Sequence, residues 1–72
     1  MKTYLLGYNF KEDKVREYSK QEIKNLEYDD FLLVKGKTLQ QAIDNYDFCW
    51  ELREKDQEAY DKDVNAKEFW ND

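Results

Sequence analysis

The C-terminal half of the chain has the apolar spacing of a long amphipathic helix. From residue 38 to residue 70 there is no glycine and no proline, so neither residue forces a helix to end. Thr38 and Gln41 have the spacing of a capping box, which marks a helix start. The pattern predicts a helix over residues 38–60, with one face repeating every three or four positions. This inner stripe comprises Leu39, Ala42, Ile43, Tyr46, Cys49, Trp50 and Arg53.

A second apolar set repeats on the opposite side of the same predicted helix. One apolar face is enough to dock a helix on its own sheet, so this second set needs another cover. We call it the outer stripe, and it comprises Phe48, Leu52, Ala59, Ala66 and Trp70.

Three covers for the outer stripe are compatible with the sequence. In the first, residues 61–63 interrupt the helix, and a terminal helix over residues 63–70, capped by Asp63, folds back on Phe48 and Leu52. In the second, the helix continues unbroken for about 50 Å and the outer stripe pairs with a second copy, which gives a homodimer. In the third, the outer stripe binds a different protein, because exposed aromatic residues bordered by carboxylates resemble a binding hot spot in composition.

The N-terminal half contains three segments with the composition of β-strands. They are residues 3–10, 15–18 and 31–35. The first two would form a hairpin whose register stays open: a two- or four-residue turn pairs Phe10 with Val15, and a three-residue turn pairs Tyr8 with Tyr18. Gly7, inside the first strand, indicates a bulge or a close approach by another side chain.

The remaining segments complete the predicted fold. Residues 31–34 are an unbroken apolar run, which indicates a strand covered on both faces. Ser19 and Glu22 have capping-box spacing, which predicts a helix over residues 19–26. We expect the third strand to pair with the first, because the second is short and charged, as edge strands are. The sequence therefore predicts a single α+β domain over residues 1–72. Its elements follow the order β-β-α-β-α, and its three-stranded sheet packs against one long C-terminal helix.

The composition gives little support to catalysis. The chain has no histidine, so the common zinc sites and the usual general base cannot be built. Cys49 is the single cysteine, and Ser19 is the single serine and occupies a capping position. We expect no enzymatic activity, no metal and no cofactor. No apolar run reaches the length of a signal peptide or a membrane span, so we expect a cytoplasmic protein without membrane contact.

Charge is distributed unevenly along the chain. The net charge is −5, of which residues 1–43 contribute +1 and residues 44–72 contribute −6. This acidity opposes direct binding to nucleic acid and favours a partner with a basic surface. An acidic helix can also imitate phosphates in a groove that normally binds nucleic acid, as small phage-encoded inhibitors do. Here that comparison is one of composition alone.

The sequence therefore favours a small acidic, non-enzymatic protein-binding module. In its most specific form this is an inhibitor that presents an acidic helix to a basic, nucleic-acid-binding partner. The alternative is a homodimeric accessory or structural protein that pairs through the outer stripe of its long helix. The predicted partner-binding residues are Asp44, Asp47, Phe48, Glu51, Leu52, Glu54, Glu58 and Trp70.

Overall fold

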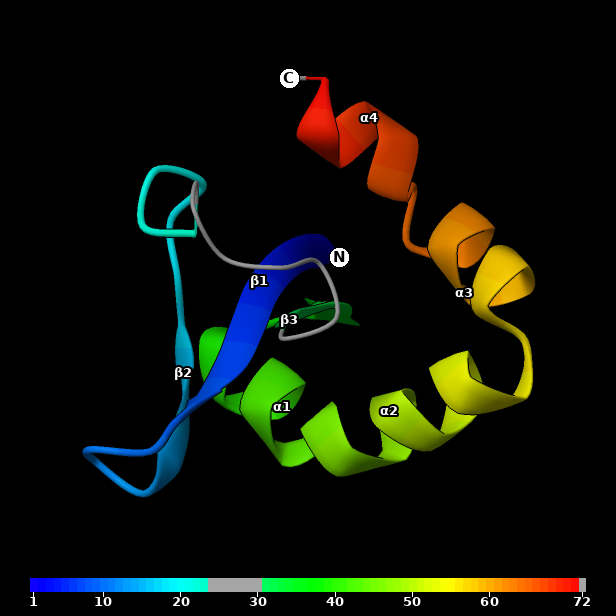
Figure 1. The fold of residues 1–72 in the computed structure, drawn as a ribbon. Coiled ribbons are helices and arrows are strands. Elements are labelled where there is room, and N and C mark those ends of the chain that lie inside the picture. The colour runs from blue at the N-terminus through cyan, green and yellow to red at the C-terminus, as the bar shows by residue number, and fades with distance from the viewer. Residues whose placement is uncertain (24–30, 72) are drawn as a thin grey trace.

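The computed structural model describes residues 1–23 and 31–71, which form an α+β fold (Figure 1). The strands are β1 (Lys2–Asn9), β2 (Lys14–Glu17) and β3 (Phe31–Gly36). The helices are α1 (Leu39–Asp44), α2 (Tyr46–Lys55), α3 (Gln57–Asp63) and α4 (Ala66–Trp70). The three strands form one antiparallel sheet in the order β2-β1-β3. The predicted pairing of the third strand with the first is therefore confirmed.

The hairpin between β1 and β2 has neither of the two registers that the sequence left open. Tyr8 lies opposite Val15, so the connecting turn consists of residues 10–13. Asp13 closes this turn with a positive φ of 54°, a conformation that Asp tolerates better than most residues. The Asp13 carboxylate also accepts a hydrogen bond from the Tyr8 hydroxyl. This local contact ends β1 at Asn9, earlier than predicted.

Both faces of the sheet are apolar and covered along the middle of β1 and the first four residues of β3. Residues opposite each other on antiparallel strands share a face, so the strand pairing assigns each side chain. The first face carries Tyr4, Leu6, Tyr8, Val15, Leu32 and Val34, and the second carries Leu5, Gly7, Arg16, Phe31 and Leu33. All four residues from Phe31 to Val34 are buried, which confirms that this strand is covered on both sides.

The helices form an arc around the β3 side of the sheet, as Figure 1 shows. α1 and α2 lie over the first face, where a hollow is lined by Val15 of β2 and Ile43 of α1. α4 lies over the second face, where a smaller hollow is lined by Thr3 of β1 and Phe69 of α4. α3 lies between them, and its Tyr60 side chain contacts β3.

The prediction of one long helix over residues 38–60 is wrong. The helical region is interrupted at Asn45, at Asp56 and at Val64 and Asn65. Asp56 is extended, with φ −156° and ψ 90°, and its carboxylate accepts a hydrogen bond from the Ala59 N–H at 3.1 Å. Asn65 is left-handed, with φ 55°. A straight helix would cover one sheet face and leave the other in water, so the breaks allow the chain to cover both.

The breaks also change where the residues of the outer stripe lie. The chain does fold back, but it turns at Val64 and Asn65 rather than at residues 61–63. It then packs on the second sheet face rather than on Phe48 and Leu52. An unbroken helix of about 50 Å is incompatible with a molecule whose longest dimension is 31 Å. The straight seam proposed for a homodimer is therefore absent.

The inner stripe continues from α1 into α2, because the break at Asn45 barely changes the helical phase. Asn45 has φ −93° and ψ 0°, close to a helical turn, and its carbonyl accepts a hydrogen bond from the Cys49 N–H. Ala42, Tyr46 and Arg53 are buried, as the spacing predicts. Leu39 departs from the pattern, because it remains 37% exposed at the start of α1.

Side chains from α2 and α3 occupy the outer edge of β3. The Tyr18 N–H donates to the Leu5 carbonyl, so the backbone groups of Leu5 point toward β2. Leu33 lies opposite Leu5, and Phe31 lies opposite Gly7. Because the backbone groups of Leu5 and Gly7 point toward β2, those of Leu33 and Phe31 have no partner on β1 and point away from the sheet. Arg53 donates to the Phe31 carbonyl at 2.8 Å and Tyr60 to the Leu33 carbonyl at 2.7 Å. Burial, together with neighbouring Cys49, raises the pKa of Tyr60, so its hydroxyl stays protonated as a donor.

The capping interaction predicted at Ser19 is present, but residues 20–23 form a turn where the sequence predicted a helix, and residues 24–26 of that predicted helix lie outside the described residues. Ser19 Oγ accepts from the Glu22 N–H at 3.2 Å, and the Glu22 carboxylate accepts from the Ser19 N–H at 2.6 Å. The same carboxylate accepts from Arg16 at 2.9 Å. These bonds favour the charged carboxylate and hold the pKa of Glu22 below its ordinary value.

Substituting Gly7 by alanine should destabilise the fold by about 1–3 kcal/mol, because there is no room for a side chain. A Cβ at Gly7 would lie 2.8 Å from Phe31 Cδ1 and 3.0 Å from Tyr18 Cε2. This confirms the predicted close approach by another side chain. Urea unfolding of Gly7→Ala would measure the loss. The same substitution in a Phe31→Leu background should cost less, and an equal cost in both backgrounds would contradict the steric explanation.

Candidate functional site

The outward face of α2 is the main candidate for a functional surface. The buried side of this helix is fixed by Tyr46 and Arg53, which are seven positions apart and both face the sheet. Phe48 and Leu52 lie four positions apart on the opposite side, so their side chains are neighbours on the helix surface. Phe48 is 60% exposed and Leu52 is 39% exposed. Two large apolar side chains therefore lie together in solvent.

Carboxylates border this apolar pair along one side. Asp47 and Glu51 are on α2 beside Phe48, and Glu54 lies on the flank of the same helix. Asp44 ends α1 one turn earlier, where its carboxylate accepts a hydrogen bond from Gln40 at 2.9 Å. All four carboxylate residues are exposed. The face therefore has an apolar side and an acidic side.

We call this surface the α2 outer face, and it contains most of the predicted partner-binding residues. Its members are Asp44, Asp47, Phe48, Glu51, Leu52 and Glu54. Glu58 is also exposed, but it belongs to the first turn of α3, beyond the break at Asp56. Lys55 lies in the last turn of α2 and adds one positive charge at the end of the face.

Trp70 does not belong to this surface, contrary to the prediction. It is on α4 and is packed beside Phe69, with ring centroids 5.2 Å apart, against the hydrophobic core. The position of α4 is further fixed by the Lys20 amine, which donates to the Phe69 carbonyl and lies 4.5 Å from the centre of its ring. The physical reason is the turn at Val64 and Asn65, which carries α4 over the second sheet face.

Sequence reasoning missed a second group of exposed apolar residues, at the β1–β2 hairpin. Phe10 is 88% exposed, because β1 ends at Asn9 and Phe10 falls in the turn instead of the strand. Its ring packs edge-to-face on Tyr8 at 5.1 Å. The polar turn residues that follow Phe10 were a signal that it could lie outside the strand.

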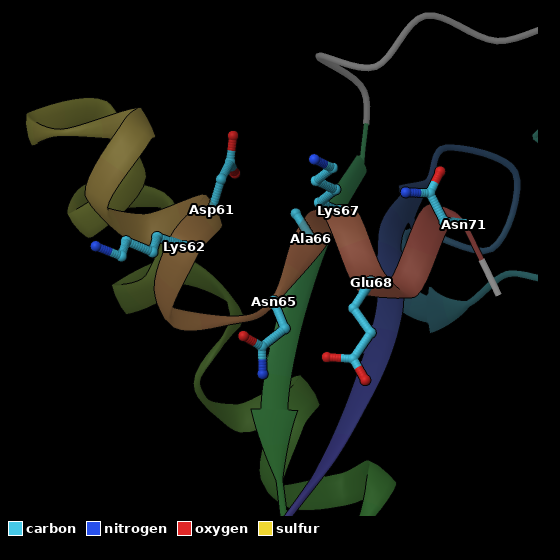
Figure 2. Close-up of a pocket in the computed structure, with 7 residues that line it drawn as sticks. All are labelled: Asp61, Lys62, Asn65, Ala66, Lys67, Glu68 and Asn71. Atoms are coloured by element: carbon cyan, nitrogen blue, oxygen red, sulfur yellow. The ribbon is translucent and has the colours of Figure 1, made fainter.

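A shallow hollow beside the turn between α3 and α4 offers little for chemistry. It measures about 400 Å³ and has both acidic and basic residues along its walls. Figure 2 shows that Asp61 and Lys67 point to one side of the chain, while Asn65 and Glu68 point to the other. The polar groups therefore do not converge on a point where a ligand atom could sit.

Three further observations concern metal binding, the single thiol and membrane contact. Within residues 1–23 and 31–71, no three His, Cys, Asp or Glu side chains are grouped as metal ligands would be. Cys49 is a free thiol that is partly buried and packed against the core. Among the described helices, none is both long and apolar enough to cross a membrane.

Comparisons with known proteins identify no relative. No protein-family model, curated protein or solved structure matches this chain.

Proposed function

We propose that this chain is a small, non-enzymatic protein-binding module whose α2 outer face binds a partner with a basic surface. The observation that carries the proposal is the exposed pair of Phe48 and Leu52 beside a row of exposed carboxylates. In α3 and α4, by contrast, the large apolar residues Tyr60, Phe69 and Trp70 pack in or against the core. A chain selected for folding alone would gain by a polar residue at Phe48.

The two components of the face have different roles in binding. Phe48 and Leu52 provide apolar area that a partner can remove from water, which is the usual source of affinity at the centre of an interface. The adjacent carboxylates, such as Asp47 and Glu51, attract a positively charged surface and accelerate the encounter. They also keep the exposed apolar pair from driving nonspecific association.

The most specific form of the proposal is an inhibitor of a nucleic-acid-binding protein. Asp47 and Glu54 are seven positions apart on α2, so its acidic residues extend along about 10 Å of helix. A groove that binds nucleic acid is lined by Lys and Arg, which would pair with these carboxylates as they do with phosphates. The proposal predicts that partner and nucleic acid compete for the same basic groove.

A salt-dependent capture experiment tests this proposal. The full chain is immobilised, and bound proteins are identified by mass spectrometry at about 0.1 M and about 1 M salt, where the Debye length falls from about 10 Å to about 3 Å. We expect the partner to be retained at low salt, to be released at high salt, and to be displaced by added duplex DNA or RNA. Recovery that is independent of both salt and nucleic acid would contradict the proposal.

A pair of charge variants provides the matched control. Glu51→Lys reverses one charge on the α2 outer face, and Glu68→Lys makes the same change in net charge on α4. Capture should be weakened much more by the first variant than by the second. Equal effects would show that overall acidity, rather than this face, attracts the partner.

The outer stripe gives no comparable support for a homodimer. Ala66 is buried and Trp70 packs on the core, so the stripe does not form a continuous seam. Light scattering of the full chain would measure its oligomeric state directly, and a monomer at tens of micromolar would be consistent with binding a different protein.

A further inference from the structure

The two edges of the sheet differ in how their outward backbone groups are used. On β3, Arg53 and Tyr60 bond to the outward carbonyls of Phe31 and Leu33. This arrangement prevents another strand from pairing there. On β2, the same alternation of the ladder leaves the N–H and C=O groups of Val15 and Glu17 pointing outward.

The outward groups of β2 have no comparable cover. The Tyr18 N–H donates to the Leu5 carbonyl, so Arg16, two residues earlier, also directs its backbone groups toward β1, where it lies opposite Gly7. The backbone groups of Val15 and Glu17 therefore point away from β1. Among residues 1–23 and 31–71, no backbone or side-chain group bonds to the outward N–H and C=O of Val15 and Glu17. β2 therefore presents a donor and an acceptor at two alternate residues, which is the pattern that an added strand requires.

An apolar hollow lies directly beside this edge, on the first face of the sheet. It measures about 480 Å³ and lies between β2 and α1, with Val15, Leu39 and Ile43 among its lining residues. Val15 and Ile43 are partly buried and Leu39 is 37% exposed, so the hollow has an apolar floor that opens to solvent. A side chain from an added strand, directed to the first face, would enter it.

We infer that the outer edge of β2 binds an extended segment of another protein, which adds to the sheet as a fourth, antiparallel strand. Its backbone pairs with Val15 and Glu17, and an apolar side chain opposite Val15 fills the hollow. This is a second interaction surface, distinct from the α2 outer face. It can fail or succeed independently of the function proposed above.

The charges of β2 specify the chemistry of this segment. Residues directly opposite each other on antiparallel strands share a face and interact most strongly. Arg16 already pairs with the exposed Glu22 carboxylate at 2.9 Å, and the Lys14 amine lies 3.7 Å from the exposed Glu12 carboxylate. Because both pairs are at the surface, each cation can still contact an acidic residue opposite it, while Glu17 favours a basic one. Read from its N-terminus, the bound segment would follow the pattern basic, acidic, apolar, acidic.

The same charges disfavour a second copy of this chain as the occupant. If two copies paired through β2 about a two-fold axis, their sheets would join into one sheet. Each β2 residue would then lie opposite a residue whose side chain is on the same side of that sheet. Pairing centred on Val15 places Lys14 opposite Arg16, and pairing centred on Arg16 places two arginines opposite each other. Both arrangements oppose like charges, so the partner is a different sequence.

Titration of the ¹⁵N-labelled full chain with a synthetic peptide tests the inference. The probe is acetylated Thr-Ile-Lys-Glu-Val-Glu-Thr, and a peptide of the same composition in scrambled order is the control. We expect chemical-shift changes and slower hydrogen exchange at the amides of Val15 and Glu17, with a Kd of about 0.1–1 mM. No change up to several times that concentration, or equal changes with the scrambled peptide, would overturn the inference.

A proline variant separates strand pairing from other contacts. Glu17→Pro removes an N–H that points outward and leaves the β1–β2 ladder intact, as prolines on edge strands do. Glu17→Ala removes the same side chain but retains the N–H. Peptide affinity should fall at least tenfold for Glu17→Pro relative to Glu17→Ala. Equal affinities of the two variants would exclude backbone pairing at this edge, and the exchange measurement on the wild type does not depend on how the variants fold.

Discussion

Replacing Arg53 by alanine should lower the free energy of unfolding by about 3 kcal/mol. Its guanidinium is buried, with 5% of the residue exposed, and it donates to the Phe31 carbonyl at 2.8 Å. The same group lies 5.1 Å from the centre of the Trp50 ring. Alanine would remove a charged donor from a buried carbonyl and leave a void where the Arg53 stem packs.

This loss is large for a chain of this size. A domain of 72 residues has a thin stability margin, and a change of 3 kcal/mol corresponds to a drop in Tm of about 12–24 °C. Circular dichroism during heating and urea unfolding would both measure it. Arg16→Ala is the matched control, because Arg16 forms an exposed ion pair with Glu22 and its loss should change Tm far less. A change in the unfolding free energy below about 1 kcal/mol for Arg53→Ala would show that this contact does not hold α2 on the sheet.

The sheet could be predicted from the sequence because its signals are local. The continuous apolar run at residues 31–34 indicated a strand buried on both faces, and the charged, short second strand indicated an edge. Together these placed the third strand beside the first. The register of the hairpin could not be predicted, because it depends on Asp13 adopting a left-handed conformation and on its contact with Tyr8.

The helix breaks were harder to predict because they depend on the sheet that the helices cover. Glycine and proline are absent from residues 38–70, but Asn and Asp also begin new helices by capping them. Asp56 does so, and its position before Gln57 and Glu58 was a readable signal for a helix start. The break at Val64 and Asn65 has no comparable signal. It follows from the apolar second face of the sheet, which a straight helix would leave exposed.

The candidate site likewise contains residues that could be placed from local spacing and residues that could not. Phe48 and Leu52 could be assigned to an outward face from the phase of α2 alone, because the inner stripe fixes the opposite side. The position of Trp70 depends on two helix breaks, at Asp56 and at Val64 and Asn65, so its distance from Phe48 could not be read from spacing. Tyr60 was missed, although it continues the seven-residue spacing of Tyr46 and Arg53 on the buried side.

Replacing both Phe48 and Leu52 by alanine should weaken binding of the captured partner by at least about 100-fold. Residues at the centre of an interface commonly cost more than 1 kcal/mol each when truncated, and a loss of about 1.4 kcal/mol is a tenfold change in affinity. The fold should change little, because both side chains are exposed in the free chain. Calorimetry or interferometry with the purified partner would give the Kd, and thermal unfolding would verify that the variant is folded.

The double variant Phe10→Ala and Leu39→Ala provides a matched control. It makes the same chemical change, Phe and Leu to Ala, at two exposed residues that lie by the hairpin and α1 instead of on α2. Affinity should fall for the first variant and remain within about threefold of wild type for the control. If the control lost affinity instead, the partner would bind beside the β2 edge, and the α2 outer face would be excluded as its binding site. Comparing the two double variants therefore shows whether the partner binds the α2 outer face or the surface beside β2.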